Sequence, residues 1–123
     1  MPRIFEYGEK EIRDHAETHI PGHMVDSMVR FIMDGIPPGD FLLAVLSNDL
    51  REAVSRADDH NLHRLYMYVQ FLFNYTPTGC WGSTEKACDW VDRGGLNGIE
   101  KQANAEAEII NAAFASRDVK ETA

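Results

Sequence analysis

One stretch decides how the chain folds: GIPPGDFLLAVL, residues 35–46. Gly35 suits the left-handed conformation that ends many helices, because glycine adopts it without a steric penalty. Pro37-Pro38 then prevents the helix from continuing, since proline lacks an amide hydrogen and clashes with the preceding turn. Asp40 can accept hydrogen bonds from the free amides that begin a new helix. The stretch therefore predicts a stiff turn between two helices.

Helical spacing of apolar residues continues on both sides of this turn. The predicted helices span about residues 9–19, 23–34, 41–57, 60–74, 84–93 and 99–115. No strand pattern of useful length competes with them. We therefore expect an all-α fold, a compact single-domain bundle of five to six short helices over residues 1–115. Residues 116–123 are polar and are expected to form a flexible tail.

The segment 60–74 is apolar almost all round, with Tyr66, Tyr68 and Phe71 among its aromatic residues. A helix of this kind is buried on most of its sides. We expect it to be the central helix of the bundle or part of an oligomer interface. A homo-oligomer is expected for this reason.

Composition narrows the classes of partner. A chain of 123 residues suits one domain. The net charge of −8 argues against direct contact with nucleic acid, which relies on Lys and Arg to displace counterions. No apolar run reaches the roughly 20 residues of a membrane helix, and the first residues lack the pattern of a signal peptide. These features predict a cytoplasmic protein that does not contact a membrane, with Cys80 and Cys88 as reduced thiols.

The loop GCWGST, residues 79–84, leads into a predicted helix and is the candidate binding site. A helix start presents free amides and a partial positive charge to an anion. Aromatic side chains can stack a base, and an arginine can pair with a phosphate. The candidate ligand-binding residues are Arg51, Arg64, Tyr66, Trp81, Gly82, Ser83 and Thr84. The competing interpretation is a capped helix with Trp81 buried in the core, and the loop lacks the lysine of a Walker motif.

Three histidines, His15, His19 and His23, recur every four residues. On a continuous helix they would share one face, where imidazoles can bind a metal. Pro21-Gly22 interrupts that helix, however. The competing interpretation is that these are solvated histidines or histidines at the edge of the core.

A thiol nucleophile is a further hypothesis, with Cys80 as the nucleophile and His60 or His63 as its base. The sequence identifies no third residue that would orient the base. The competing interpretation is a cysteine that packs as a small buried hydrophobe. We expect no catalytic residue and no cofactor.

The turn at residues 35–40 belongs to a longer pattern. Its parts are GIPPGDFL (35–42), AVLSNDL (44–50), Ala57-Asp58 and GCWGS (79–83). In this pattern the chain resembles a family of small uncharacterised proteins carried by tailed phages and prophages. The resemblance covers about residues 21–95. It implies an origin in an infected or lysogenic bacterial host, and it brings no established catalytic residues.

Phage accessory proteins of this size often inhibit a host process, including defence, and many act by binding. We therefore expect a non-enzymatic protein that sequesters a small anionic, nucleotide-like signal. The first alternative is a protein inhibitor or DNA mimic that uses an acidic surface. That surface would include Asp26, Asp34, Asp49, Glu52, Asp58 and Asp59. A small metal- or thiol-dependent enzyme is the second alternative, and an assembly or replication factor whose aromatic helix dimerises is the third.

Overall fold

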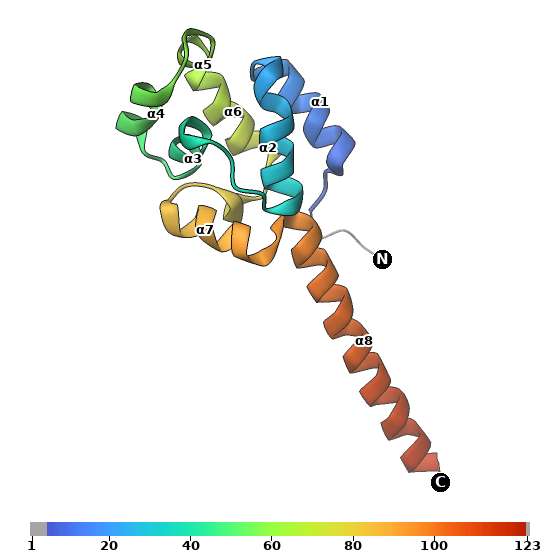
Figure 1. Ribbon diagram of the computed structural model, residues 1–123. Coiled ribbons are helices and arrows are strands. Elements are labelled where there is room, and N and C mark those ends of the chain that lie inside the picture. The colour runs from blue at the N-terminus through green and yellow to red at the C-terminus, as the bar shows by residue number, and fades with distance from the viewer. Residues whose placement is uncertain (1–4, 123) are drawn as a thin grey trace.

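The computed structural model describes the backbone of residues 5–122 and the side chains of residues 5–115. Within these residues the chain forms eight α-helices, one short 3-10 turn and no strand, which confirms the all-α prediction (Figure 1). The predicted count of five to six helices is too low. The elements are α1 (Glu9–His19), α2 (Gly22–Asp34), α3 (Asp40–Leu46), α4 (Leu50–Arg56), α5 (Asp59–His63), α6 (Leu65–Tyr75), η1 (Thr78–Cys80), α7 (Thr84–Arg93) and α8 (Gly95–Thr122).

The helix predicted over residues 41–57 is divided into α3 and α4. Asn48 breaks it with a φ of 60°, a left-handed conformation that asparagine tolerates better than most residues. The Asp49 side chain then accepts a hydrogen bond from the Glu52 amide, 3.2 Å away, and so begins α4. The sequence predicts that Asp40 caps α3 in the same way, but Asp40 is the first residue of α3 and instead pairs with Arg56 at 3.4 Å.

The helix predicted over residues 60–74 is divided at Arg64 into α5 and α6. Asp58 starts α5, since its side chain accepts a hydrogen bond from the Asn61 amide at 2.7 Å. Asn61 is buried, and its Oδ1 accepts a 2.6 Å hydrogen bond from the hydroxyl of Tyr68 on α6. This bond holds the two helices at a fixed bend and satisfies both buried polar groups.

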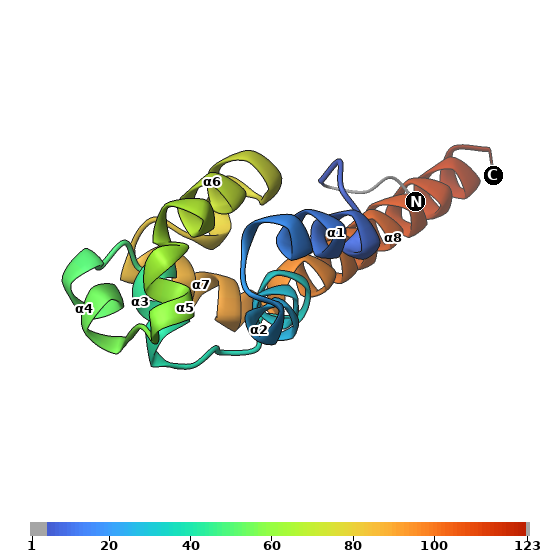
Figure 2. The ribbon, with the colours of Figure 1, turned by 90° about the horizontal axis from the view of Figure 1, so that it is seen from above.

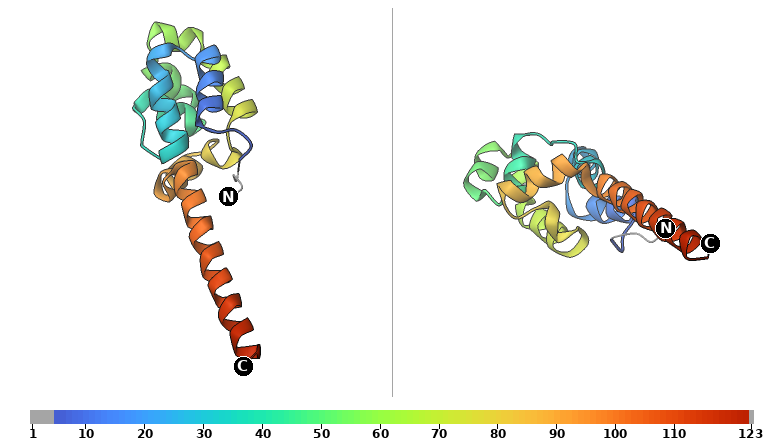
Figure 3. Two further views of the ribbon diagram at one scale, coloured as in Figure 1. Left: turned by 90° about the vertical axis from the view of Figure 1, so that its right-hand side faces the viewer. Right: turned by 90° about the horizontal axis from the view of Figure 1, so that it is seen from below.

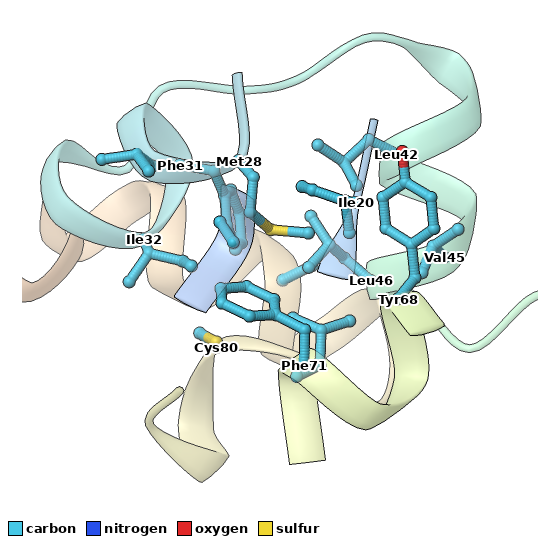
Figure 4. Packing of buried hydrophobic residues seen from close by; sticks show 14 of the residues in the cluster. Ile20, Met28, Phe31, Ile32, Leu42, Val45, Leu46, Tyr68, Phe71 and Cys80 are labelled. Atoms are coloured by element: carbon cyan, nitrogen blue, oxygen red, sulfur yellow. The ribbon is translucent and has the colours of Figure 1, made fainter. Parts of the chain in front are cut away.

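The core lies between α2, α3 and α6, and α1 packs against α2 and α6. Figure 4 shows Met28 and Phe31 from α2, Leu46 from α3 and Phe71 from α6 directed toward one another. All four side chains are fully buried, and so is Cys80 at the end of η1. Burying a large apolar side chain stabilises a fold by about 1.5–3 kcal/mol, so these residues are the main source of stability.

Glycines let α2 and α8 meet backbone to backbone. Gly35 ends α2 with a φ of 67°, as its place before the two prolines predicts. A Cβ atom added to Gly95 would lie 2.4 Å from the Gly35 nitrogen, so only glycine fits this approach. The indole nitrogen of Trp90 donates to the carbonyl oxygens of Phe31 (3.2 Å) and Ile32 (3.0 Å) in the last turn of α2, where the Phe31 carbonyl also accepts from the Gly35 amide at 3.0 Å.

Beyond this junction α8 projects away from the rest of the chain (Figures 1 and 3). It begins at Gly95, four residues before the predicted start, and its backbone stays helical to Thr122, past the predicted end at residue 115. The flexibility of residues 116–123 stays a prediction. Seen from above, α4 and the end of α8 lie at opposite ends of the molecule (Figure 2). The chain therefore has a compact body, α1–α7, and one projecting helix.

Candidate functional site

Six large apolar side chains of α4, α5 and α6 are exposed on the body, and we call them the outer apolar face. They are Leu50 and Val54 of α4, Leu62 of α5, and Tyr66, Val69 and Phe73 of α6. Phe73 is 76% exposed, Leu50 68% and Tyr66 64%. Surface apolar residues are common when scattered, but a contiguous group of them is characteristic of a binding surface.

Helical spacing places three of these residues in one row. Tyr66, Val69 and Phe73 of α6 are separated by three and four positions, which is the spacing of one side of a helix, whereas Leu62 belongs to α5 beyond the break at Arg64. Segment 60–74 is therefore not buried on most of its sides within the chain, and the alternative that it forms part of an oligomer interface stays a prediction. The physical reason is position: α6 lies at the edge of the body, where it packs against α1 and α5 and nothing in the described part of the chain covers its outer row.

A small cavity lies between α4 and α6. It measures about 50 Å³, and Leu50 and Val69 line it from the two sides. Leu65 and Ala53 line it as well, so its walls are mainly apolar. This hollow brings Leu50 of α4 and Val69 of α6 to one place on the surface.

Three of the seven predicted ligand-binding residues lie on or beside this face. Tyr66 belongs to it. Arg51 directly follows Leu50, and Arg64 stands at the break between α5 and α6; both are exposed. The Arg64 guanidinium donates to the sulfur of Met67 at 3.5 Å.

The loop residues lie in a different setting. Trp81 is half-buried and packs against the core, as the competing interpretation describes. The Gly82 amide donates to the Leu46 carbonyl oxygen at 2.8 Å, and the Ser83 hydroxyl accepts from the Lys86 amide at 3.1 Å. The Gly82 amide and the Ser83 hydroxyl are therefore already engaged within the protein.

Thr84 lines a larger cavity of about 250 Å³ between α3, α4 and α7. Three carboxylates line it too, and its only cation among the lining residues, Arg56, pairs with two of them at 3.4 Å each. The lining residues are Asp40, Leu43, Ala44, Ser47, Asp49, Glu52, Arg56 and Thr84. The excess of negative charge makes this cavity unfavourable for an anionic ligand.

The three histidines do not converge. His15 stacks on Tyr75 with ring centroids 3.8 Å apart, and His19 donates from Nδ1 to the His15 carbonyl at 2.8 Å. His23 instead faces Asp58, with 3.2 Å between Nε2 and Oδ2. Among the described side chains no group of three or more His, Cys, Asp or Glu could hold a metal ion.

Cys80 lies inside the core, and burial raises the pKa of its thiol to about 12. The thiolate is the nucleophilic form of cysteine, so this thiol is unreactive near neutral pH. His60 and His63 are exposed on α5. Cys80 thus packs as a small hydrophobe, which matches the competing interpretation.

The described helices include none that combines the length and hydrophobicity needed to cross a membrane. The row on α6 could have been recognised from its spacing, but sequence gives no signal that distinguishes an exposed row from a buried one. Comparisons with protein-family models, with curated proteins and with solved structures found no match to this chain.

Proposed function

We propose that this protein is a non-enzymatic binding protein that docks another protein on its outer apolar face. One observation carries the proposal: Phe73, Tyr66 and Leu50, with three further apolar side chains, are exposed together on a chain of net charge −8. Leaving such side chains in water forgoes about 1.5–3 kcal/mol for each that a partner would bury fully.

The chemistry of the face fits protein recognition. Tyr66 and Phe73 are seven residues apart, so they stand about 10 Å from each other along α6, as two anchors on one helix do. Aromatic residues and arginines dominate the energetics of protein interfaces. Arg51 follows Leu50 in the sequence and Arg64 lies between Leu62 and Tyr66, and these exposed cations favour a partner whose apolar residues are flanked by carboxylates.

The biological setting that we propose is the counteraction of a host process, such as a defence system, by a phage or prophage protein. This part rests on the resemblance in residues 21–95 alone. The sequence offers the blocking of a host protein as an alternative that uses an acidic surface, and we assign the blocking instead to the outer apolar face because its large apolar side chains are exposed rather than set in a pocket. Sequestration of a nucleotide-like anion stays a prediction with less support, since Gly82 and Ser83 are engaged in the fold.

The proposal is tested by immobilising the full chain and capturing proteins from a bacterial lysate. Three forms are compared: the wild type, Phe73→Asp on the face, and Ile36→Asp as a control, because Ile36 is exposed but lies away from the face in the turn after α2. A specific partner should be retained by the wild type and Ile36→Asp, and lost by Phe73→Asp.

Salt separates this proposal from the acidic-surface alternative. Apolar docking persists in about 0.5 M salt, whereas binding through exposed charges is largely screened there. A partner that all three forms retain, or one that is released by salt, would refute docking on the outer apolar face.

A further inference from the structure

The small cavity between α4 and α6, which we call the hollow, is a concave part of the outer apolar face. Val45 and Ala53 are buried and form its floor. Leu50 and Val69 are exposed on its two sides, so the hollow meets solvent between them. A concave apolar site at the surface is suited to receive an apolar group of another molecule.

The size of the hollow limits what can enter it. Its volume is about 50 Å³. An apolar cavity that holds a benzene ring measures about 150 Å³, and a water molecule occupies about 30 Å³ in the liquid. The hollow therefore has room for the end of an aliphatic side chain but not for an aromatic ring. Five of its seven lining residues are apolar, which favours an apolar group over a polar one.

The fold favours a helix as the segment that carries this group. An extended peptide binds by adding a strand to the edge of a sheet, and the described residues form no strand. An amphipathic helix instead lays its apolar side on an apolar surface, with anchors three or four residues apart. Tyr66 and Phe73 stand about 10 Å apart along α6, a length that two turns of a partner helix match.

Charge gives a second property of the partner. The chain has 20 acidic residues, yet residues 60–84, which include all of α6, contain none. Arg64 is exposed in this segment and forms no ion pair within the described residues, since its guanidinium donates to the sulfur of Met67. The one carboxylate that lines the hollow, Asp49, comes from the α4 side and accepts from the Glu52 amide. A carboxylate of the partner therefore meets no like charge from α6 and can pair with Arg64.

We propose that the hollow receives an aliphatic side chain, such as leucine, from an amphipathic helix of the partner, and that this helix carries carboxylates on the side facing Arg64. The inference rests on the proposed function, because it specifies the protein segment that the outer apolar face binds. An aromatic anchor does not fit the volume of the hollow. A helix flanked by lysines would place like charges beside Arg64.

The probe is a synthetic amphipathic helical peptide with glutamates on both flanks of its apolar side and one guest position at the centre of that side. Calorimetry measures its binding to the full chain with leucine, alanine or phenylalanine as the guest. Leucine should bind at least about tenfold more tightly than alanine, which leaves the hollow unfilled, and than phenylalanine, which is too large to enter it. A peptide with lysines in place of the glutamates should bind at least about threefold more weakly.

Two matched variants separate the hollow from the rest of the face. Val69→Phe adds bulk where Val69 lines the hollow, and should weaken binding of the leucine peptide at least about tenfold. Val54→Phe makes the same change on the outer apolar face at a residue that does not line the hollow, and should alter binding less than about threefold. Val69 is 46% exposed and Val54 45%, so both variants should keep the fold, which circular dichroism checks.

The proposal is overturned if leucine and phenylalanine guests bind equally, if Val69→Phe and Val54→Phe act alike, or if the lysine peptide binds as tightly as the glutamate peptide. Docking on the outer apolar face would survive these results provided that Phe73→Asp abolishes binding. A leucine peptide that does not bind below about 1 mM also overturns the proposal, and the lysate experiment then judges the proposed function separately. Self-association of the full chain that Val69→Phe abolishes would assign the hollow to a second copy and overturn the proposal as well.

Discussion

The two sides of α6 carry similar side chains in opposite environments. Tyr68 and Phe71 face inward and are fully buried, whereas Tyr66 and Phe73 face outward and are mostly exposed. A tyrosine and a phenylalanine on each side thus form an internal control. The inner pair, Tyr68 and Phe71, therefore stabilises the fold. The outer pair, Tyr66 and Phe73, makes little contribution to stability, and we propose that it binds a protein.

The largest difference is expected between two phenylalanines. Phe71→Ala should lower the free energy of unfolding by about 3–5 kcal/mol, because it removes a buried ring and leaves a cavity. Phe73→Ala should change it by no more than about 0.5 kcal/mol, as is usual for exposed positions. Urea unfolding of both variants measures the difference, and equal losses would show that the outer row is part of the core.

The two tyrosines give a smaller difference. Tyr68→Phe removes the hydroxyl that donates to Asn61 and leaves a buried acceptor without its partner, at a cost of about 1–3 kcal/mol. Tyr66→Phe removes an exposed hydroxyl and should be close to neutral in stability. The same unfolding experiment applies, and a larger loss for Tyr66→Phe than for Tyr68→Phe would reverse the assignment of the two sides.

The stability contributed by the Tyr68 hydroxyl should depend on pH in the alkaline range. Burial, followed by the charge of Asp58, raises the pKa of Tyr68 above its ordinary value of 10.0. The unfolded chain therefore loses this proton first as the pH rises above about 10, and the stability that the neutral hydroxyl supplies is fully present below that pH and falls above it. Wild type should lose more stability than Tyr68→Phe between about pH 8 and pH 11, and equal losses in thermal melts would contradict the buried hydroxyl.

The smallest effect concerns local opening of the core. Cys80 lies with Phe71 in the core (Figure 4), while Cys88 on α7 is exposed. A thiol reagent should modify Cys88 at once and Cys80 only when the core opens. Phe71→Ala should speed the slow phase, and Phe73→Ala should leave it unchanged. A slow phase that responds to both variants would mean that the outer row also holds the core closed.

Local signals in the sequence predict the helix ends well. Gly35 and Gly94 end α2 and α7 in the left-handed conformation, and Ser83 caps the start of α7. The internal breaks are less visible, because Asn48 and Arg64 interrupt segments whose apolar spacing continues through them. The first break has a local signal, since Asn48 tolerates the left-handed conformation and Asp49 caps α4, whereas Arg64 offers no such signal for the second.

The candidate site is less predictable for a related reason. Periodicity shows that Tyr66 and Phe73 share a side of α6, but which side faces solvent depends on where α1 and α5 pack. The loop at residues 79–84 is attractive as a binding site in the sequence because it contains free donors in isolation. The Gly82 amide instead donates to the Leu46 carbonyl oxygen, a contact that the linear sequence does not display, and the Ser83 hydroxyl accepts from the Lys86 amide as the cap of α7.

If the outer apolar face binds a protein, the dissociation constant of a captured partner should depend on the side chains of that face. The purified partner should be titrated by calorimetry into wild type and Phe73→Ala, whose unfolding free energies should be equal. We predict that Phe73→Ala weakens binding by about 30-fold or more, the effect of losing a central aromatic anchor. An unchanged dissociation constant for Phe73→Ala would show that the partner does not bind on the outer apolar face.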